Sequence, residues 1–270
     1  MEFIQILTLS IVQGITEFLP ISSSAHLVLV PVFAHWGDQG FLFDIGVHVG
    51  TLLAVMLYFR CEVKSLFTGT FQLMCGNVST VQAKLALMLI FSTLPLVLVG
   101  PFVKDWVSIF ARSLPIIAGT SIGYGVLLYW ADKRVEKCST EAKEMTAKHA
   151  LIYGLFQALA VVPGTSRSGI CMTAGRLLGF SRVDASRYAM LMSIPIILLI
   201  GGYSGLGYVL DPVEALGKPS ELLMGVFLTF IAAYASIHLL MKFVEKVGFL
   251  PFVIYRLVLG FLLIGYIFIA

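Results

Sequence analysis

Long runs of apolar residues, separated by short polar stretches, make up most of the chain. Six of these runs hold about 15 to 21 residues, which suits membrane-spanning helices, because about 20 helical residues cross the hydrocarbon core of a bilayer. Apolar and polar residues do not alternate along the runs, which excludes a transmembrane β-barrel. The pattern predicts six membrane-spanning helices, at residues 41–59, 85–102, 116–130, 188–208, 222–241 and 251–270.

Two pairs of shorter apolar runs are each joined by a proline and a cluster of hydroxyl residues. Pro20 and Pro163 are each predicted to end a helix, because proline lacks a backbone hydrogen-bond donor. Helices of about 13 residues are roughly 20 Å long, short of a hydrocarbon core of roughly 30 Å. We therefore predict two re-entrant helical hairpins, over about 1–35 and about 150–180. Gln13 and Gln157 precede the two prolines at similar distances, which indicates a weak internal duplication.

The distribution of positive charge predicts how these elements lie in the membrane. If the six spans alternate in direction, thirteen Lys and Arg residues fall on one side and only Lys104, Arg112 and Lys218 on the other. By the positive-inside rule the first side is cytoplasmic, so both termini and the first hairpin face outward and the second hairpin enters from the cytoplasm. Two hairpins of opposite orientation form an inverted-topology repeat, which places a binding site near the midplane. The predicted fold is one all-α polytopic membrane domain over residues 1–270.

Composition supports the membrane class and excludes others. Hydrophobic residues make up 59% of the chain, charged residues 12%, and the mean hydropathy is +0.95. The net charge of +3 comes with no basic patch, so we expect no nucleic-acid partner and many contacts with membrane lipids. The first run has no basic segment before it and is not a signal peptide. The cysteines lack the spacing of metal ligands and are predicted to be reduced structural thiols, at Cys61, Cys75, Cys138 and Cys171.

The second hairpin tip, residues 163–169 (PGTSRSG), carries the ingredients of an anion-binding site. A helix that starts near Ser166 or Ser168 offers free backbone N–H groups and the positive end of its dipole. Arg167 adds a guanidinium that can hold a phosphate by two hydrogen bonds. The alternative is a cytoplasmic turn with a solvated arginine and a serine cap. The predicted phosphate-binding residues of this tip are Gly164, Thr165, Ser166, Arg167 and Ser168.

The first hairpin carries ionisable residues beside its tip. Glu17 lies in an apolar run without a basic neighbour, and we predict a metal ligand or general base rather than a hydrogen-bonded structural acid. Gln13 is four residues earlier on the same helical face and could orient Glu17 or a water. His26 follows three serines and is predicted to be an acid or base, the alternative being a packed histidine.

Other polar residues receive structural interpretations. Asp44 and His48 are spaced to pair within one span, in a structural or supporting role. Arg256 is predicted to extend toward the cytoplasmic headgroups. Three further histidines are interpreted as interfacial, namely His35, His149 and His238.

These residues resemble a known family. The segment from Gln13 to His26 (QGITEFLPISSSAH) resembles the (E/Q)xxxE motif with its following Ser and His, and residues 163–169 resemble the PGxSRSG motif, of the bacterial undecaprenyl-diphosphate phosphatases, also called bacitracin resistance proteins. The resemblance runs along the whole chain, including Phe43–Asp44 and residues 193–195 and 249–256. It implies hydrolysis of a C55 polyprenyl diphosphate to the monophosphate carrier of peptidoglycan synthesis, at a site in the inner membrane that faces the periplasm. For the oligomeric state, a monomer and a homodimer are both compatible with the resemblance.

The resemblance also implies roles for individual residues. Glu17 and Gln13 match the acidic motif and would hold a divalent cation, Mg²⁺ or Ca²⁺. Ser23 matches the nucleophilic serine, with Ser22 and Ser24 beside it on the phosphate, although water is an alternative nucleophile. Either Glu17 or His26 could take the nucleophile's proton. The chain has Gln rather than Glu at 13, which the motif allows but which weakens the prediction of a two-carboxylate metal site, and it has Ala25 where Gly is common.

Two other classes of function are alternatives. A transporter or flippase of polyprenyl phosphates would also use inverted repeats around an anion site at the midplane. A structural membrane protein would leave the residues of both tips without a role.

Overall fold

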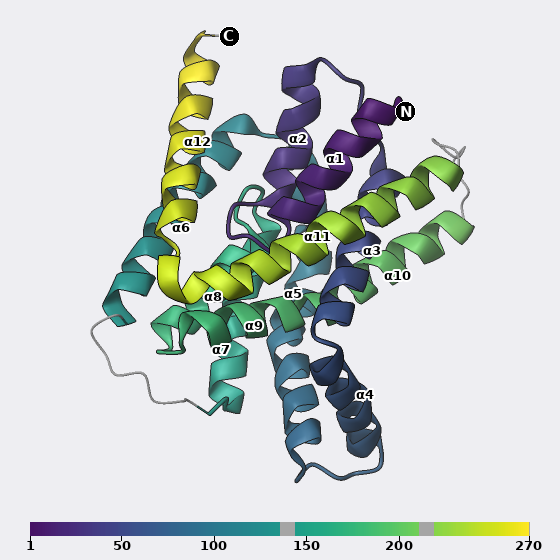
Figure 1. Cartoon of the computed structure of the whole chain (residues 1–270), viewed down its shortest axis with the longest axis vertical. Coiled ribbons are helices and arrows are strands. Elements are labelled where there is room, and N and C mark those ends of the chain that lie inside the picture. The colour runs from purple at the N-terminus through teal and green to yellow at the C-terminus, as the bar shows by residue number, and fades with distance from the viewer. Residues whose placement is uncertain (136–143, 211–218, 270) are drawn as a thin grey trace.

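The computed structural model describes residues 1–135, 144–210 and 219–269, and within them every regular element is helical (Figure 1). Cys138 and Lys218 lie outside the described residues. The first hairpin consists of α1 (Phe3–Thr16) and α2 (Ser23–Ala34). The second consists of α7 (Ala147–Ala158), a 3₁₀ turn η1 (Leu159–Val161) and α8 (Arg167–Leu177). Both hairpins are thus confirmed as short helix pairs, while their depth in a membrane stays a prediction.

Five of the six predicted spans are present, and the sixth, at residues 41–59, is long enough only together with the helix that follows it. Five helical segments are each long and apolar enough to cross a membrane, and α3 (Phe41–Tyr58) qualifies jointly with α4 (Arg60–Met74). The others are α5 (Val81–Phe110), α6 (Leu114–Val135), α9 (Arg182–Leu191) continued by α10 (Ser193–Leu210), α11 (Pro219–Val247) and α12 (Leu250–Ile269). The all-α polytopic fold class is confirmed.

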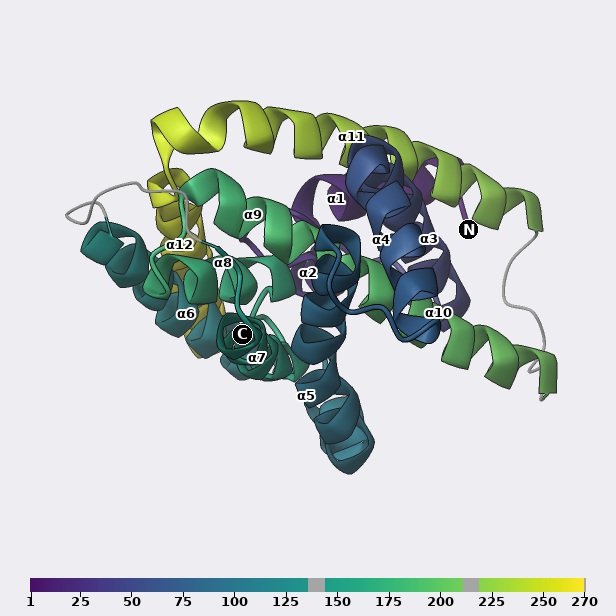
Figure 2. The ribbon, with the colours of Figure 1, turned by 90° about the horizontal axis from the view of Figure 1, so that it is seen from below.

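The segment after the first span, for which the sequence pattern predicted no element, is helical. The chain bends by 93° between α3 and α4, and α4 then packs back along α5. Val63 and Gly69 of α4 are buried in this contact, whereas Arg60 and Lys64 are exposed. In Figure 1 the α4–α5 pair projects below the rest of the molecule, and in Figure 2 one end of α5 stands apart from the other helices.

The two hairpins pack in a reciprocal way. The first hairpin places Gly14 of α1 against α11, where an added Cβ would lie 2.6 Å from the Ala232 Cβ. The second places Gly154 of α7 against α5, where a Cβ would lie 2.7 Å from the Ser92 carbonyl oxygen. Each half of the chain therefore docks its hairpin on a long helix of the other half. This exchange is the packing expected of two repeats related by a pseudo-twofold axis.

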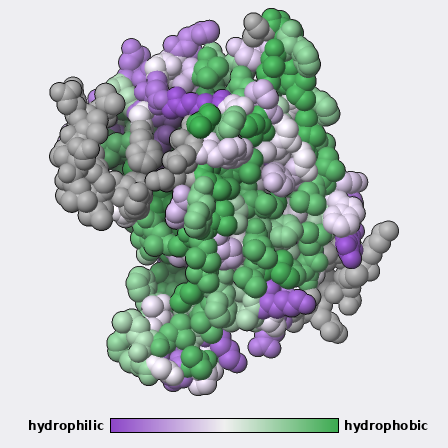
Figure 3. Space-filling view, turned by 180° about the vertical axis from the view of Figure 1, so that it is seen from behind, coloured by the Kyte–Doolittle hydropathy of each residue, from purple (hydrophilic) through white to green (hydrophobic). Residues whose placement is uncertain are grey.

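The core lies where the hairpin tips meet. In Figure 1 the hairpin of α1 and α2 and that of α7 and α8 approach from opposite ends of the molecule and their tips meet near its centre. All residues of α8 from Ser168 to Arg176 are buried. The face of the molecule in Figure 3 is apolar over most of its area, as a lipid-facing surface requires. Large apolar side chains such as Phe102 and Phe261 are exposed.

Candidate active site

The two tips have the same local structure. Ser22 and Ser166 are the N-cap residues of α2 and α8, and both have positive φ, of 76° and 67°. Each N-cap hydroxyl accepts a hydrogen bond from the backbone three residues on, Ala25 N at 3.4 Å and Gly169 N at 3.2 Å. Left-handed backbone is strained for serine, and such strain concentrates at functional sites.

This shared structure gives Ser23 and Arg167 equivalent positions, because each is the first residue of its helix. Both side chains are half-buried, whereas the serines before them, Ser22 and Ser166, are buried. The hydroxyl oxygens of Ser22 and Ser24 lie 3.2 Å apart, and those of Ser166 and Ser168 lie 3.3 Å apart.

Direct hydrogen bonds join the two tips. The Ser168 hydroxyl lies 3.1 Å from the Glu17 carbonyl oxygen and 3.0 Å from that of Leu19, and can donate to either. The Thr165 hydroxyl donates within its own tip, to Val162 O at 2.6 Å. Gly164 has a φ of +81° and is buried. Among the predicted phosphate-binding residues of the second tip, only Arg167 is not buried, so the others build the tip while Arg167 reaches out of it.

Arg256 links both tips, and the prediction that it extends to the headgroups is wrong. Its side chain is 1% exposed. The guanidinium donates to the carbonyl oxygens of Thr165 at 2.9 Å and Gly164 at 3.2 Å in the second tip, and to Pro20 O at 3.4 Å in the first. It also donates to two carbonyls of α6, those of Thr120 and Ser121. The carbonyls of Pro20, Gly164 and Thr165 lie in the two tips, outside any helix, and the N–H donors of one arginine satisfy them.

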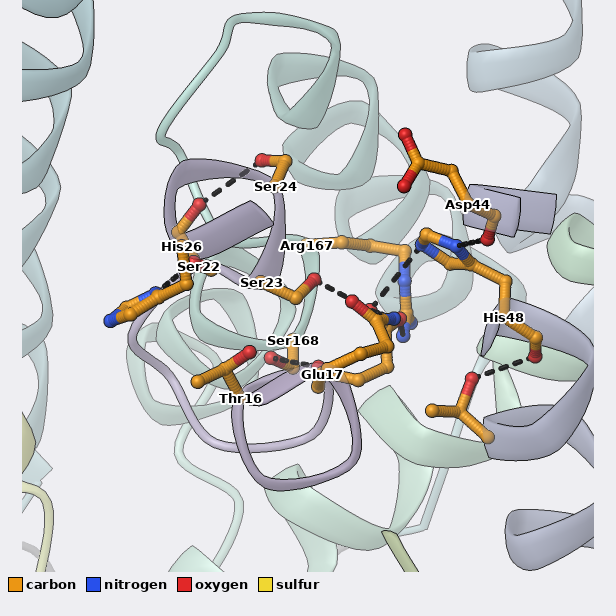
Figure 4. A network of polar contacts seen from close by, with 12 residues as sticks. Thr16, Glu17, Ser22, Ser23, Ser24, His26, Asp44, His48, Arg167 and Ser168 are labelled. Atoms are coloured by element: carbon orange, nitrogen blue, oxygen red, sulfur yellow. Dashed lines mark hydrogen bonds and ion pairs between the residues drawn. The ribbon is translucent and has the colours of Figure 1, made fainter. Parts of the chain in front are cut away.

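Glu17 is the centre of the site (Figure 4). Its Oε1 accepts from Arg167 Nη2 at 2.9 Å, across the junction of the two tips. Its Oε2 accepts from the Ser23 hydroxyl at 2.7 Å and from Gln13 Nε2 at 3.0 Å. The carboxylate is 7% exposed, so the arginine and the two neutral donors replace the water it has lost. The structure thus brings together Gln13, Glu17, Ser23 and Arg167.

His48 faces the same carboxylate, although the sequence indicated only a structural or supporting role. Its Nε2 lies 3.7 Å from Glu17 Oε2, and its Nδ1 lies 2.6 Å from the main-chain oxygen of Asp44. The predicted Asp44–His48 pair therefore forms through the backbone, while the Asp44 carboxylate accepts from Gln39 Nε2 at 2.9 Å. The i, i+4 spacing revealed the pair, but only the tertiary fold brings α3 to the first tip.

His26 points elsewhere. Its Nδ1 lies 2.6 Å from Ser22 O, its Nε2 lies 2.5 Å from the Tyr255 hydroxyl, and the two rings stack with centroids 5.6 Å apart. In Figure 4 the imidazole is directed away from Glu17. In this arrangement the proton acceptor next to Ser23 is Glu17.

The residues around Glu17 fit a divalent cation. Gln13 is fully buried and its Oε1 has no hydrogen-bond partner, while the amide nitrogen of the same group contacts Glu17. Carboxylate and amide oxygens are the ligands that Mg²⁺ and Ca²⁺ prefer. No group of three His, Cys, Asp or Glu side chains that could hold a metal occurs among the described residues. The protein would therefore supply only part of the ligand set, as it usually does for Mg²⁺ bound with a phosphate substrate.

Apolar cavities lie next to the site. One of about 260 Å³ lies beside His48, between α3 and α10, and is lined by Asp44, Ile45, His48, Val49, Ile197, Ile200 and Gly201. A groove of about 670 Å³ follows α1 and α11 and includes Leu19, two residues from Glu17. Apolar chains could occupy both.

Comparisons with known proteins show the family to which the chain is similar. The family model described as "Bacitracin resistance protein BacA" matches residues 6–262. An undecaprenyl-diphosphatase 1 of Pseudoalteromonas translucida is 46% identical over 96% of this chain and 97% of its own length. An undecaprenyl-diphosphatase of Hahella chejuensis is 43% identical over 100% of both chains.

Proposed function

The chain belongs to the BacA family of bacitracin resistance proteins, and from that membership and the Glu17 site we propose that it is an undecaprenyl-diphosphatase. The enzyme hydrolyses undecaprenyl diphosphate to undecaprenyl phosphate and inorganic phosphate. This reaction regenerates the lipid carrier of peptidoglycan synthesis, and with it resistance to bacitracin. The enzyme works as a multi-pass protein of the bacterial inner membrane, with the site open to the periplasm.

One observation carries the proposal for the site. A single carboxylate, Glu17, accepts a hydrogen bond from the hydroxyl of Ser23 on one tip and from the guanidinium of Arg167 on the other. A hydroxyl 2.7 Å from a carboxylate is within the reach needed for proton transfer. A guanidinium at the same point can stabilise the charge of a phosphoryl group. Nucleophile, base and anion-binding group therefore converge.

The reaction follows from these contacts. The Ser23 oxygen attacks the terminal phosphorus while its proton passes to Glu17, and the bond from that phosphorus to the bridging oxygen breaks, releasing undecaprenyl phosphate. Water then attacks the phosphoserine, returning the Ser23 hydroxyl and releasing phosphate. Arg167 holds the nonbridging oxygens through both steps. Attack by a water in place of Ser23 is the competing route.

A divalent cation, Mg²⁺ or Ca²⁺, would complete the site. Glu17 and Gln13 would hold it from the protein side, and oxygens of the diphosphate would supply further ligands. When bound, it neutralises charge on the nonbridging oxygens. The polyprenyl chain lies in the apolar cavities beside the tips, in contact with membrane lipids.

The test is phosphate release from undecaprenyl diphosphate by the purified protein in detergent, where transport cannot occur. We expect turnover by the wild type and a loss of about 10²-fold or more in Arg167→Lys, because lysine keeps the charge but loses the two-pronged contact. Arg60→Lys, an exposed position on α4, is the matched control and should keep full turnover. Binding of the lipid without phosphate release by the wild type would point to a carrier instead.

A further inference from the structure

His48 is held in one tautomer with one nitrogen directed at the site. Its Nδ1 donates to the main-chain oxygen of Asp44 at 2.6 Å, which leaves the Nε2 lone pair of the neutral ring free to bind. That nitrogen lies 3.7 Å from Glu17 Oε2. A histidine whose other nitrogen donates to a carbonyl is the usual arrangement of an imidazole metal ligand.

The spacing suits a shared ion. Ligand atoms that are each about 2.1 Å from one metal lie at most about 4.2 Å apart, and the Nε2 to Oε2 distance is below that limit. The 3.7 Å is also too long for a hydrogen bond, so the two atoms face the same point without bonding each other.

Gln13 provides an independent observation. It is fully buried, and its Oε1 has no partner although a buried amide oxygen normally has one. Its Nε2 lies 3.0 Å from the same Glu17 Oε2. A half turn of the amide would exchange the two atoms and direct an oxygen at the point that His48 and Glu17 face.

We propose that His48 Nε2, Glu17 Oε2 and Gln13 Oε1 form a mixed nitrogen and oxygen site, so that the ion-binding site also accepts a first-row transition-metal ion such as Mn²⁺ in place of Mg²⁺ or Ca²⁺. The proposal rests on the proposed function, because the ion is the one that assists phosphate release. Imidazole binds first-row transition metals well, whereas Mg²⁺ and Ca²⁺ prefer oxygen ligands alone. Gln13 is a neutral ligand, so Glu17 is the one charged group of this ligand set, and the His48 imidazole adds a third ligand.

The experiment detects the nitrogen directly. The full-length protein is purified in detergent, freed of metal with a chelator and loaded with Mn²⁺, and electron spin-echo envelope modulation is recorded for protein with ordinary and with ¹⁵N-labelled histidine. We expect modulation from one directly coordinated nitrogen that changes with the isotope. This measurement needs no variant, so it holds even if a substituted protein fails to fold.

Variants then identify the histidine. His48→Gln should lose the nitrogen modulation and weaken Mn²⁺ binding by about 10-fold or more, with a smaller change for Mg²⁺. His238→Gln, at an exposed histidine of α11 whose ring contacts Tyr58, is the matched control and should retain both.

Two outcomes overturn the proposal: bound Mn²⁺ without nitrogen modulation, or modulation that persists in His48→Gln. Failure to bind Mn²⁺ overturns it as well. If the wild type still releases phosphate in these cases, His48 is removed from the metal site while the proposed function stands. Nitrogen coordination without phosphate release would instead remove the function and leave the metal site.

Discussion

At the scale of single residues, the site depends on how one buried carboxylate is balanced. Taking a carboxylate out of water costs several kcal/mol, and removal of one partner of a buried ion pair costs about 3–5 kcal/mol. Arg167 supplies the balancing charge to Glu17, and Ser23 and Gln13 supply neutral donors. A phosphoryl group that draws Arg167 toward itself leaves Glu17 a stronger base for the Ser23 proton.

Substitution of Ser23 separates the two routes of attack. If Ser23 is the nucleophile, Ser23→Ala should abolish phosphate release while lipid binding persists, because Arg167 and the cation still hold the diphosphate. If water attacks, the loss should be only the roughly 10²–10³-fold of one missing hydrogen-bond donor. Phosphate release gives the rate, and Ser79→Ala, in the exposed turn before α5, is the control for loss of a hydroxyl.

Rapid quenching followed by mass spectrometry locates the intermediate. Phosphate on Ser23 of the wild type would agree with covalent attack. Phosphate on Ser22 or Ser24 would contradict the assignment, and no phosphoserine at any quench time would favour water.

The residues that could be predicted from the sequence are those whose partners are local or whose motif is complete. Gln13 and Glu17 share a helical face, and their hydrogen bond follows from that spacing. His48 could not be assigned to the site because its approach to Glu17 depends on α3 packing beside the first tip. The prediction that Arg256 extends to the headgroups failed for a similar reason. No pattern in the sequence shows that five main-chain carbonyl oxygens accept hydrogen bonds from its guanidinium.

At the scale of elements, the broken hairpins carry the site. Proline and serine mark both tips in the sequence, so the helix ends were predicted closely, and α8 begins at Arg167 as expected. The helix α4 was not predicted, because it is interrupted by charged and polar residues and its buried face depends on contact with α5. Local signals therefore predict where helices break, and tertiary contacts decide what the broken ends meet.

A pair of glycines tests how tightly the second tip is built. Gly164 and Gly76 have nearly the same φ, +81° and +80°, so an alanine at either position suffers the same left-handed strain of about 1–2 kcal/mol. A Cβ at Gly164 would also meet the Thr120 hydroxyl and lie 2.9 Å from Ile117 Cα, whereas nothing lies within 4 Å at Gly76. Gly164→Ala should therefore lower the melting temperature more than Gly76→Ala and also reduce phosphate release.

Thermal unfolding in detergent measures both variants. Equal shifts in melting temperature for Gly164→Ala and Gly76→Ala would contradict this prediction. They would mean that Thr120 and Ile117 move away from the added methyl group without a loss of stability.

At the scale of the whole molecule, the chain has two similar halves, and the hairpin of each half packs against a long helix of the other half. The N-terminal ammonium lies 3.0 Å from the Glu221 carboxylate at the start of α11, so the first residue and the start of that helix share one end of the molecule. The count of positive charges predicts that this end faces the periplasm. It also predicts that the turn before α5 and the start of α7 face the cytoplasm.

Labelling of single cysteines in intact cells tests this topology. In a cysteine-free background, Glu2→Cys and Ser220→Cys should react with a membrane-impermeant maleimide from outside, and Ser79→Cys and Thr146→Cys only after the membrane is opened. The turnover of each variant is its control for correct folding. Protection of Glu2→Cys together with Thr146→Cys would place both hairpins on one side and contradict the inverted repeat.

The Arg167–Glu17 contact also has a thermodynamic consequence, because its two residues come from different halves of the chain. A ligand that touches both tips binds only when the halves are docked, so its binding free energy adds to their association. By mass action, a ligand at 100 times its Kd stabilises the docked state by about 2.7 kcal/mol. Bound diphosphate therefore stabilises the association of the two halves at the hairpin tips. When the products leave, this added stabilisation is lost until the next substrate binds.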